Sequence, residues 1–405
     1  MYLIVKKIMN ELQIEEYRLV VHNTRKYICE FSNDVLKEHV TALSRNSLYF
    51  LYSGKMGKIE FSDIEEDVLK KIIVQYMDNK KFYLETMKMI GGLGNSKTGN
   101  KLSVDFEDRV GCIKKEVTEK VNQGYGGLMI KDVYVWGNML VYSGEEIVKE
   151  QYEKNFTQMM FFAPHFFSMC SEELPYGGML DVKKDGESFG INNVEMVLNG
   201  VKRIKFSRKV FGTILKMLVQ CLNGMNVINN LSIFDKTDFG KQILKKGIFI
   251  SDCPFAENNT RMFDDEGMEL HEKILVDNGK LNECINNILS AGILEQSAGN
   301  CLHNLVLDMD WPEQSKVYFI YTEGGKNKED YEAYITGILD NNVSLDGRNG
   351  NLFFNCIGVD KQDKCVQYTL STNLLRFFNS VIAVDGELEE YLGCMVPEVI
   401  VDFSI

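Results

Sequence analysis

No segment of the chain reaches the run of about 18 apolar residues that a membrane-spanning helix requires. The opening stretch MYLIVKKIMNELQIEEY also lacks the long apolar core and small-residue cleavage site of a signal peptide. None of the ten cysteines belongs to a C-x-x-C pair, and they are scattered through apolar segments such as LVQCLNG, where a thiol packs as a small hydrophobe. These absences predict a reduced, cytoplasmic protein with no membrane partner.

Positive charge is also scarce. The chain has 45 lysines and arginines against 58 aspartates and glutamates, for a formal net charge of -13. An acidic surface repels phosphate backbones, so direct nucleic-acid binding is not expected. The most basic stretch, from Lys202 to Lys209, is better explained as the solvated start of a helix.

What the chain does contain is the composition of an ordinary globular protein. Its 405 residues are 45% hydrophobic and 25% charged, and this length predicts two domains. We expect an N-terminal domain over 1–200 and a C-terminal domain over 201–405. The glycine-rich, polar stretch 91–101 is typical of a loop or linker.

Hydrophobic periodicity predicts an α+β protein with antiparallel sheets and a β-rich C-terminal domain. Apolar residues at helical spacing predict helices over 3–13, 64–79, 105–124 and 208–224. Alternating patterns predict hairpins that turn at 23–25, 54–57, 137–138 and 278–279. Asn278-Gly279 is the strongest of these signals, since both residues tolerate the positive φ of a type I′ turn.

His271-Glu272 matches the first two letters of the zinc-peptidase signature H-E-x-x-H. That signature works because two imidazoles one helical turn apart face the same way, but here Leu275 and Val276 stand four and five residues after His271. The remaining histidines, none of which has another within five residues, are His22, His39, His165 and His303. A catalytic zinc site is therefore not predicted, and the dipeptide is best explained as coincidence.

Three weaker candidates are also better explained by structure. Cys301 and His303 form a Cys-x-His pair that is more typical of core packing than of a metal site. The stretch from Gly91 to Thr98 resembles a P-loop, but Ser96 replaces the second glycine and the flanking pattern is wrong. Cys253 follows a predicted strand without a basic neighbour, which favours an inert thiol.

Asp264, Asp265 and Glu266 form an acidic cluster directly before Gly267. Three adjacent carboxylates can coordinate a cation or accept hydrogen bonds from backbone N–H groups at a tight turn. Aspartate is a strong turn-former and glycine supplies backbone freedom, so the turn is favoured. The sequence leaves the role of the cluster open.

An ordered series of motifs resembles the TldD/PmbA family. It begins with an Asp-x-Pro step at Asp252 and Pro254, followed by Phe-Asp-Asp-Glu-Gly and the strand and turn over 275–281. A Ser/Thr-Gly-Asn step is matched by SAGN at 297–300, with Ala298 inserted, and a closing helix follows Thr372, where glycine is usual. The central helix region and the opening residues also resemble the family, so the likeness spans most of the chain.

This family has a TldD-like branch, which carries an H-E-x-x-x-H helix and is a zinc peptidase, and a TldE/PmbA-like branch, which lacks it. The corresponding interval here, 213–246, contains no histidine, so the chain resembles the second branch, which includes proteins named modulators of DNA gyrase. The resemblance implies a cytoplasmic, metal-free subunit that pairs with a TldD-like partner, or with itself, to degrade or mature unfolded peptides. It implies no catalytic, cofactor-binding or metal-binding residue in this chain, with zinc expected only in the partner.

Two alternatives stay open on the sequence. One is a homodimeric module that binds peptides or a client protein without catalysis. The other is a stand-alone hydrolase whose nucleophile the sequence does not locate.

Overall fold

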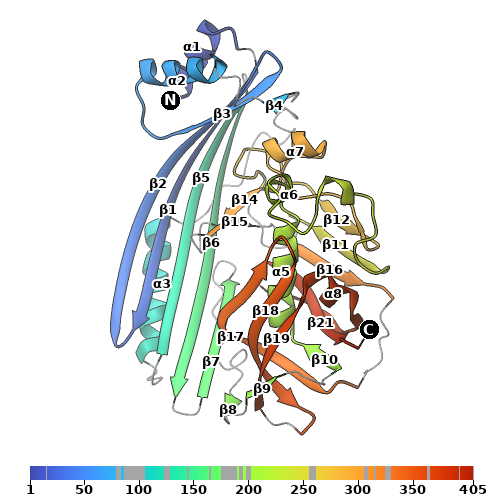
Figure 1. The fold of residues 1–405 in the computed structure, drawn as a ribbon. Coiled ribbons are helices and arrows are strands. Elements are labelled where there is room, and N and C mark those ends of the chain that lie inside the picture. Colours follow the sequence, from blue (N-terminus) through green and yellow to red (C-terminus); the bar gives the residue numbers. More distant parts are fainter. Residues whose placement is uncertain are drawn as a thin grey trace.

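The chain folds into two large sheets with helices packed around them (Figure 1). The computed structural model describes residues 1–14, 16–78, 84–85, 105–122, 128–143, 146–163, 166–174, 189–190, 195–197, 202–254, 261–304, 309–313, 316–323, 330–362, 365–391 and 393–404. The candidate linker 91–101, its P-loop-like motif and His165 lie outside these residues. No helix in the described ranges is long and apolar enough to cross a membrane.

The N-terminal sheet is antiparallel and has eight strands in the order β4-β3-β2-β1-β5-β6-β7-β8. Its strands are β1 (Tyr17–Ser32), β2 (Val35–Tyr52), β3 (Lys55–Phe61), β4 (Leu84–Glu85), β5 (Leu128–Ser143), β6 (Glu146–Ala163), β7 (Phe166–Leu174) and β8 (Phe189–Gly190). The long central strands form a curved wall beside the C-terminal half (Figure 1).

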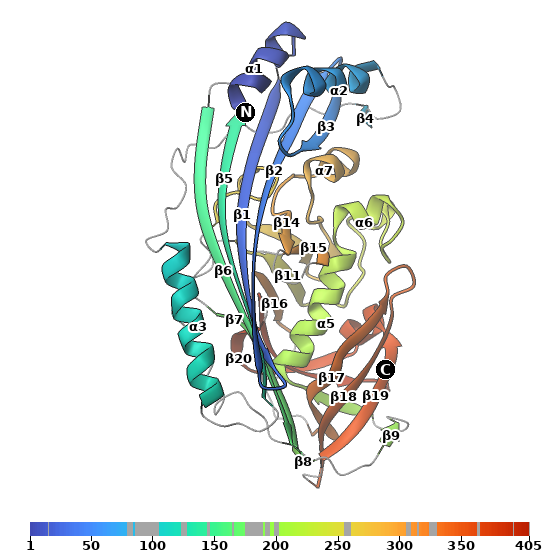
Figure 2. The same ribbon diagram turned by 90° about the vertical axis from the view of Figure 1, so that its left-hand side faces the viewer.

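Within the described residues, this sheet is covered by three helices: α1 (Tyr2–Glu11), α2 (Glu66–Asp78) and α3 (Phe106–Asn122). The first two pack together at one end of the wall, where they bury apolar residues such as Ile8 and Ile73. Helix α3 lies on the opposite face from the C-terminal half (Figure 2). It packs Ile113 and Val117 against Tyr27 and Tyr134, so apolar residues are also buried on this face of the sheet.

Two predicted hairpins of this sheet are wrong. The patterns at 23–25 and 137–138 lie within the continuous strands β1 and β5, and the real turn after β1 is at Asn33-Asp34, where φ is 50° and 60°. Gly137 is a strand glycine because the Tyr152 ring lies over it: a Cβ at 137 would stand 2.1 Å from that ring. Tertiary packing therefore overrides the local turn signal.

The second sheet has eleven strands in the order β13-β12-β11-β16-β21-β10-β17-β18-β19-β9, with β20 paired to β21. They are β9 (Glu195–Val197), β10 (Arg203–Phe206), β11 (Ile248–Asp252), β12 (Lys273–Asp277), β13 (Lys280–Leu281), β16 (Val317–Tyr321), β17 (Ala333–Asp346), β18 (Asn351–Asp360), β19 (Cys365–Asn373), β20 (Val381–Tyr391) and β21 (Cys394–Asp402). A separate pair is formed by β14 (Leu302–Asn304) and β15 (Met309–Glu313).

Helix α5 (Arg208–Cys221) lies in the main core, with shorter segments α6 (Gly224–Ile228), η1 (Lys236–Asp238), α7 (Ile288–Leu294) and α8 (Leu374–Asn379) around it. The predicted N-G hairpin is confirmed, because β12 and β13 are joined by Asn278 and Gly279 with φ of 49° and 77°. The predicted α+β class with antiparallel sheets is also confirmed, although β9, β10 and β16 add parallel pairings. The division near residue 200 stays a prediction.

Candidate functional site

The acidic cluster lies where the loop before β12 meets the N-terminal sheet. Phe263 is fully buried and packs with Val20, Val141 and other residues of the sheet in one hydrophobic cluster that also includes Ile288 of α7. Asp264, Asp265 and Glu266 are 0%, 8% and 5% exposed, so three carboxylates are withdrawn from water together. Burial of charge on this scale requires compensating partners.

Asp264 builds the turn itself. Its Oδ1 accepts hydrogen bonds from the backbone N–H groups of Glu266 and Met268 at 3.0 and 2.9 Å, and its Oδ2 accepts one from Cys301 at 3.2 Å. The Gly267 N–H donates to the Asp264 carbonyl at 3.0 Å, and φ of Gly267 is 70°. The turn that the sequence favours is confirmed.

Gly267 has a second role, because it is the point of closest approach to the sheet. A Cβ at this position would lie 2.8 Å from a Val141 methyl and 3.1 Å from a Val20 methyl. The Arg18 guanidinium donates to the Gly267 carbonyl at 3.3 Å. Only glycine combines this backbone conformation with this contact distance.

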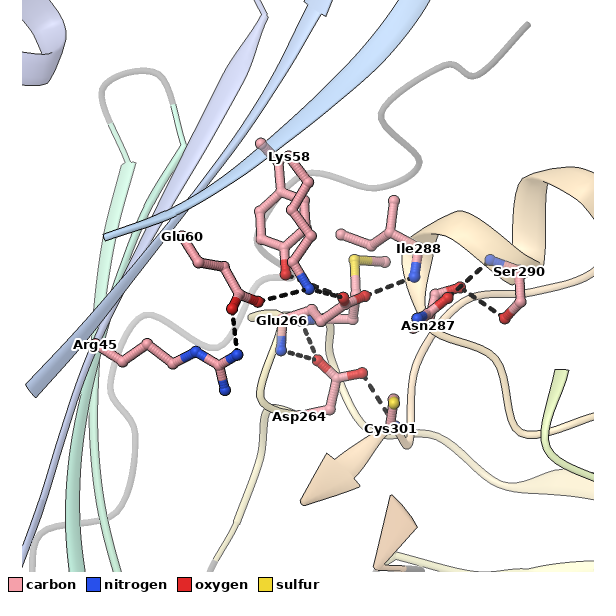
Figure 3. Close-up of polar contacts among 11 residues, drawn as sticks. Arg45, Lys58, Glu60, Asp264, Glu266, Asn287, Ile288, Ser290 and Cys301 are labelled. Atoms are coloured by element: carbon pink, nitrogen blue, oxygen red, sulfur yellow. Dashed lines mark hydrogen bonds and ion pairs between the residues drawn. The ribbon is translucent and has the colours of Figure 1, made fainter. Parts of the chain in front are cut away.

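Glu266 reaches across the interface (Figure 3). Its Oε1 accepts a hydrogen bond from the Tyr49 hydroxyl at 3.0 Å and lies 3.3 Å from Lys58 Nζ. Its Oε2 accepts a hydrogen bond from the Ile288 N–H, in the first turn of α7, at 2.6 Å. Lys58 also pairs with Glu60 at 3.0 Å, so the carboxylate belongs to a charged network that continues to the surface.

Asp265 faces a different partner. Arg261 donates to its Oδ1 at 2.7 Å and also lies over the Tyr152 ring, 4.2 Å from the ring centre. The Tyr152 hydroxyl is hydrogen-bonded to His22, and Glu150 accepts a hydrogen bond from the Met262 N–H. Arginine suits this buried contact because its guanidinium can stack on an aromatic ring while it donates to a carboxylate.

Burial sets the proton affinities of this site. Burial, assisted by the nearby Glu266 carboxylate, raises the pKa of Asp264 to about 7. Burial also raises the pKa of the Tyr49 hydroxyl and of the Cys301 thiol. Burial alone would lower the pKa of Lys58, but the attraction of Glu266 and Glu60 outweighs it, and the pKa is raised.

The arrangement joins two halves of the chain and does not converge on a metal. Asp264 is bonded to its own turn, Asp265 to Arg261, and Glu266 to the sheet and α7. Among the residues that the structure describes, no group of three or more histidine, cysteine, aspartate or glutamate side chains could hold a metal ion. The chemistry supported here is positioning of the loop and α7 on the sheet.

The motif residues Asp252 and Asn300 form a second buried contact, separate from the acidic cluster. Both are fully buried, and the Asn300 amide donates to Asp252 Oδ2 at 2.9 Å. The Lys316 N–H donates to Asp252 Oδ1 at 3.2 Å. The Asp-x-Pro and SAGN steps therefore form one buried polar contact.

The structure separates His271 from Glu272. The His271 ring lies near Glu269 and Ser297, whereas Glu272 lies 3.6 Å from the Cys253 thiol. Burial, assisted by Glu272, raises the pKa of Cys253, which fits a thiol that is not activated. His39 is exposed on β2, and the side chain of His303 lies outside the described residues.

The basic stretch near residue 202 is not the solvated start of a helix throughout, because Arg203–Phe206 is strand β10 and α5 begins at Arg208. Its cations face acids: Arg203 lies 2.9 Å from Asp402, and Arg208 lies 3.1 Å from Glu389. Lys205 lies within 3 Å of two carboxylates, at 2.6 Å from Asp385 and 2.8 Å from Glu398. These three cations are therefore paired with carboxylates.

Sequence reasoning missed the partners of the acidic cluster. Tyr49, Lys58 and Arg18 belong to strands more than 200 residues earlier in the chain, as the separations of 217, 208 and 249 residues show. Arg18, a buried cation in the apolar first half of β1, is a local signal that this strand meets buried charge.

Comparison with known proteins agrees with this fold. Residues 199–405 match the family described as PmbA/TldA metallopeptidase C-terminal domain. No curated protein matches the sequence.

Three solved structures share the fold over nearly the whole chain. A protein named as a modulator of a DNA gyrase from Thermotoga maritima is 15% identical with a TM-score of 0.72, covering 99% of this chain and 98% of its own. TldE from Thermococcus kodakarensis is 12% identical with a TM-score of 0.66, covering 98% of each chain. A protein named as a modulator of DNA gyrase from Bacteroides thetaiotaomicron is 14% identical with a TM-score of 0.66, covering 99% and 97%.

Proposed function

The chain belongs to the PmbA/TldD family, and on this premise we propose that it is a metal-free, TldE-like subunit that joins a zinc-bearing, TldD-like partner to cleave or mature unfolded peptides. The partner supplies the zinc, the activated water and the general base. This chain supplies the walls that hold the peptide extended.

The composition of α5 carries the proposal. Its sequence, RKVFGTILKMLVQC, has no histidine, aspartate or glutamate, and most of its residues are buried in the main core. Its one cysteine, Cys221, is buried, and burial raises the pKa of the thiol to about 11, which disfavours the thiolate that zinc requires. The interval 213–246, where the resemblance places the metal-binding helix of the TldD-like branch, begins within α5 and contains no histidine.

An open strand edge supports the peptide-holding role. Strand β3 pairs with β2 only over 46–52, and the preceding residues 35–45 of β2 are exposed and pair only with β1 among the described residues. Val40 and Leu43 on this stretch are 52% and 57% exposed. Backbone groups of an extended peptide can bond to such an edge whatever the peptide sequence.

Direct DNA contact is not part of this proposal, although two structures with this fold are named modulators of DNA gyrase. The net charge is -13. The most basic stretch is paired with carboxylates, as Arg203 with Asp402 illustrates. Phosphate backbones would meet little uncompensated positive charge there.

The test compares hydrolysis of an unfolded peptide by this chain, by a TldD-like protein from the same source, and by their mixture. We expect cleavage above that of the TldD-like protein only in the mixture, and loss of this cleavage when a chelator is added. Substituting both Val40→Lys and Leu43→Lys is expected to lower the mixed activity, whereas Leu3→Lys on α1, at a side chain 77% exposed, serves as the matched control.

Two outcomes would reject the proposal. Peptide cleavage by this chain alone would indicate a self-sufficient hydrolase. A mixture no more active than the TldD-like protein, together with peptide binding by a homodimer of this chain, would indicate a binding module without catalysis.

A further inference from the structure

Ser297 is an exposed serine with three ionisable neighbours from different segments. Its Oγ lies 3.4 Å from His271 Nε2, 3.2 Å from Lys273 Nζ and 2.8 Å from Glu283 Oε2. His271 precedes β12, Glu283 follows β13, and Ser297 follows α7. The fold therefore gathers a hydroxyl, an imidazole, an ammonium and a carboxylate at one point outside the acidic cluster.

His271 is held firmly in place. The Asn300 side chain accepts a hydrogen bond from the His271 N–H at 3.1 Å and donates to the His271 carbonyl at 2.7 Å. Gly299 leaves room for the ring, because a Cβ there would lie 3.1 Å from His271 Cε1. Since Asn300 is fully buried, the backbone of His271 has a rigid support.

The hydrogen-bond partners of His271 assign its tautomer. Nδ1 lies 3.3 Å from the Glu269 carbonyl oxygen, which can only accept a hydrogen bond. Nδ1 therefore carries the proton in the neutral ring, and the lone pair of Nε2 faces the Ser297 hydroxyl. This is the orientation that a general base for a serine nucleophile requires.

Lys273 positions Ser297 and adds positive charge beside its hydroxyl. The Lys273 side chain is fully buried, and its Nζ donates to the Ser297 carbonyl at 2.7 Å as well as to Oγ. A cation at this distance stabilises negative charge that develops on Oγ. Glu283 Oε2 accepts a hydrogen bond from the Ser297 hydroxyl in the resting arrangement, and rotation of the hydroxyl turns it toward His271.

We propose that Ser297 is a nucleophile for acyl transfer from small esters, with His271 as its general base. The Oγ–acyl bond forms as the bond to the leaving oxygen breaks, the serine proton passes to His271 Nε2, the phenolate departs, and His271 releases the proton to solvent. Water then attacks the acyl-serine and gives a proton to His271, which passes it to Oγ as the acyl–Oγ bond breaks, and the carboxylic acid is released. An ester suits this site because a phenolate leaves without a general acid, unlike the amine of a peptide bond.

The inference goes beyond the proposed subunit role and does not depend on a metal-bearing partner. The experiment uses the full chain alone, with a chelator present, and follows p-nitrophenolate release from p-nitrophenyl acetate. A fluorophosphonate probe and peptide mass analysis then locate the modified side chain. We expect a burst stoichiometric with the chain and a fluorophosphonate adduct on Ser297.

Four variants make the test specific. Ser297→Ala is expected to abolish the burst and the adduct, and His271→Gln to slow acylation by about 100-fold or more. Glu283→Ala removes the other acceptor of the serine hydroxyl and is expected to slow acylation less than His271→Gln does. Ser44→Ala changes another exposed serine, whose hydroxyl donates to Asn23 at 2.8 Å, and is expected to match the unmodified chain.

The proposal is overturned if the Ser297→Ala chain shows an undiminished burst, or if the probe leaves Ser297 unmodified. Loss of acylation in Glu283→Ala but not in His271→Gln would overturn the role of His271. Circular dichroism and thermal unfolding of each variant show that the fold is retained, and Ser44→Ala supplies the reference for both.

Discussion

The Tyr49 hydroxyl donates a hydrogen bond to Glu266 at 3.0 Å, although 217 residues separate them. Tyr49 is 1% exposed and Glu266 is 5% exposed, so the bond is made away from water. The same carboxylate also binds Lys58 and the N–H of Ile288. One side chain thus connects the N-terminal sheet, the acidic loop and α7.

Coupling between Tyr49 and Glu266 is the first prediction. A hydrogen bond to a charged group contributes about 1.5–3 kcal/mol, and Tyr49→Phe removes the donor without changing the ring. We expect the Tyr49→Phe and Glu266→Gln variants to lose less stability together than the sum of their separate losses. Urea unfolding of the two single variants and the double variant measures this coupling. Strict additivity would show that the bond contributes nothing.

Gly267→Ala is predicted to destabilise the chain more than Gly54→Ala. Both glycines have positive φ, 70° and 73°, so both substitutions incur the backbone strain of about 1–2 kcal/mol. Gly54 has open space around its Cα, whereas a Cβ at 267 meets Val141 at 2.8 Å. Thermal unfolding of Gly54→Ala measures the backbone strain alone, and thermal unfolding of Gly267→Ala measures the strain together with the contact to the sheet. Equal losses of stability would mean that the sheet accommodates the added methyl group without a free-energy penalty.

Asp264 is predicted to make stability depend on pH. Its pKa is raised from 3.8 to about 7, so the folded state binds the proton more tightly than the unfolded state. Its contribution is therefore fully present below the unfolded pKa and declines as the pH rises toward about 7. We expect the stability of the unmodified chain relative to Asp264→Asn to fall between about pH 4 and about pH 7, as measured by urea unfolding at each pH.

Asp346→Asn is the matched control for this pH dependence. Asp346 also accepts backbone hydrogen bonds in a turn, from Arg348 and Asn349 at 3.1 and 3.3 Å. Its pKa is lowered, with the Asn349 hydrogen bonds as the main cause, so its contribution is complete above the unfolded pKa and lost only in acid. The difference in free energy of unfolding between the unmodified chain and Asp346→Asn is expected to stay constant over the same pH range. If that difference also falls, the pH dependence has a cause other than the burial of Asp264.

Local signals predicted much of the secondary structure. Helical spacing placed α1, α2, α3 and α5 close to their observed bounds. The same kind of reasoning failed at 23–25 and 137–138, because turn-forming residues can occupy a long strand when neighbours on both sides pair with it. Thr24 lies opposite both Leu43 and Gly137, which no local pattern reveals.

The candidate sites divide in the same way. The sequence identified the acidic cluster and the likeness to a known family, but it treated His271-Glu272 as an isolated dipeptide. Ser297 and Glu283 follow His271 by 26 and 12 residues, which is too far for a short motif to connect them. Only the folded chain brings Ser297 into contact with His271, Lys273 and Glu283.

By itself, the sequence determined the turn at Asp264 to Gly267 and the absence of a metal ligand set on α5. Both depend on residues within a few positions of one another, where an aspartate carboxylate and a glycine φ act locally. Tertiary structure alone decided what the carboxylates bind, because Tyr49 and Lys58 reach Glu266 only when the two sheets pack together. Burial at that contact, which no single segment can produce, is also what raises the pKa of Asp264.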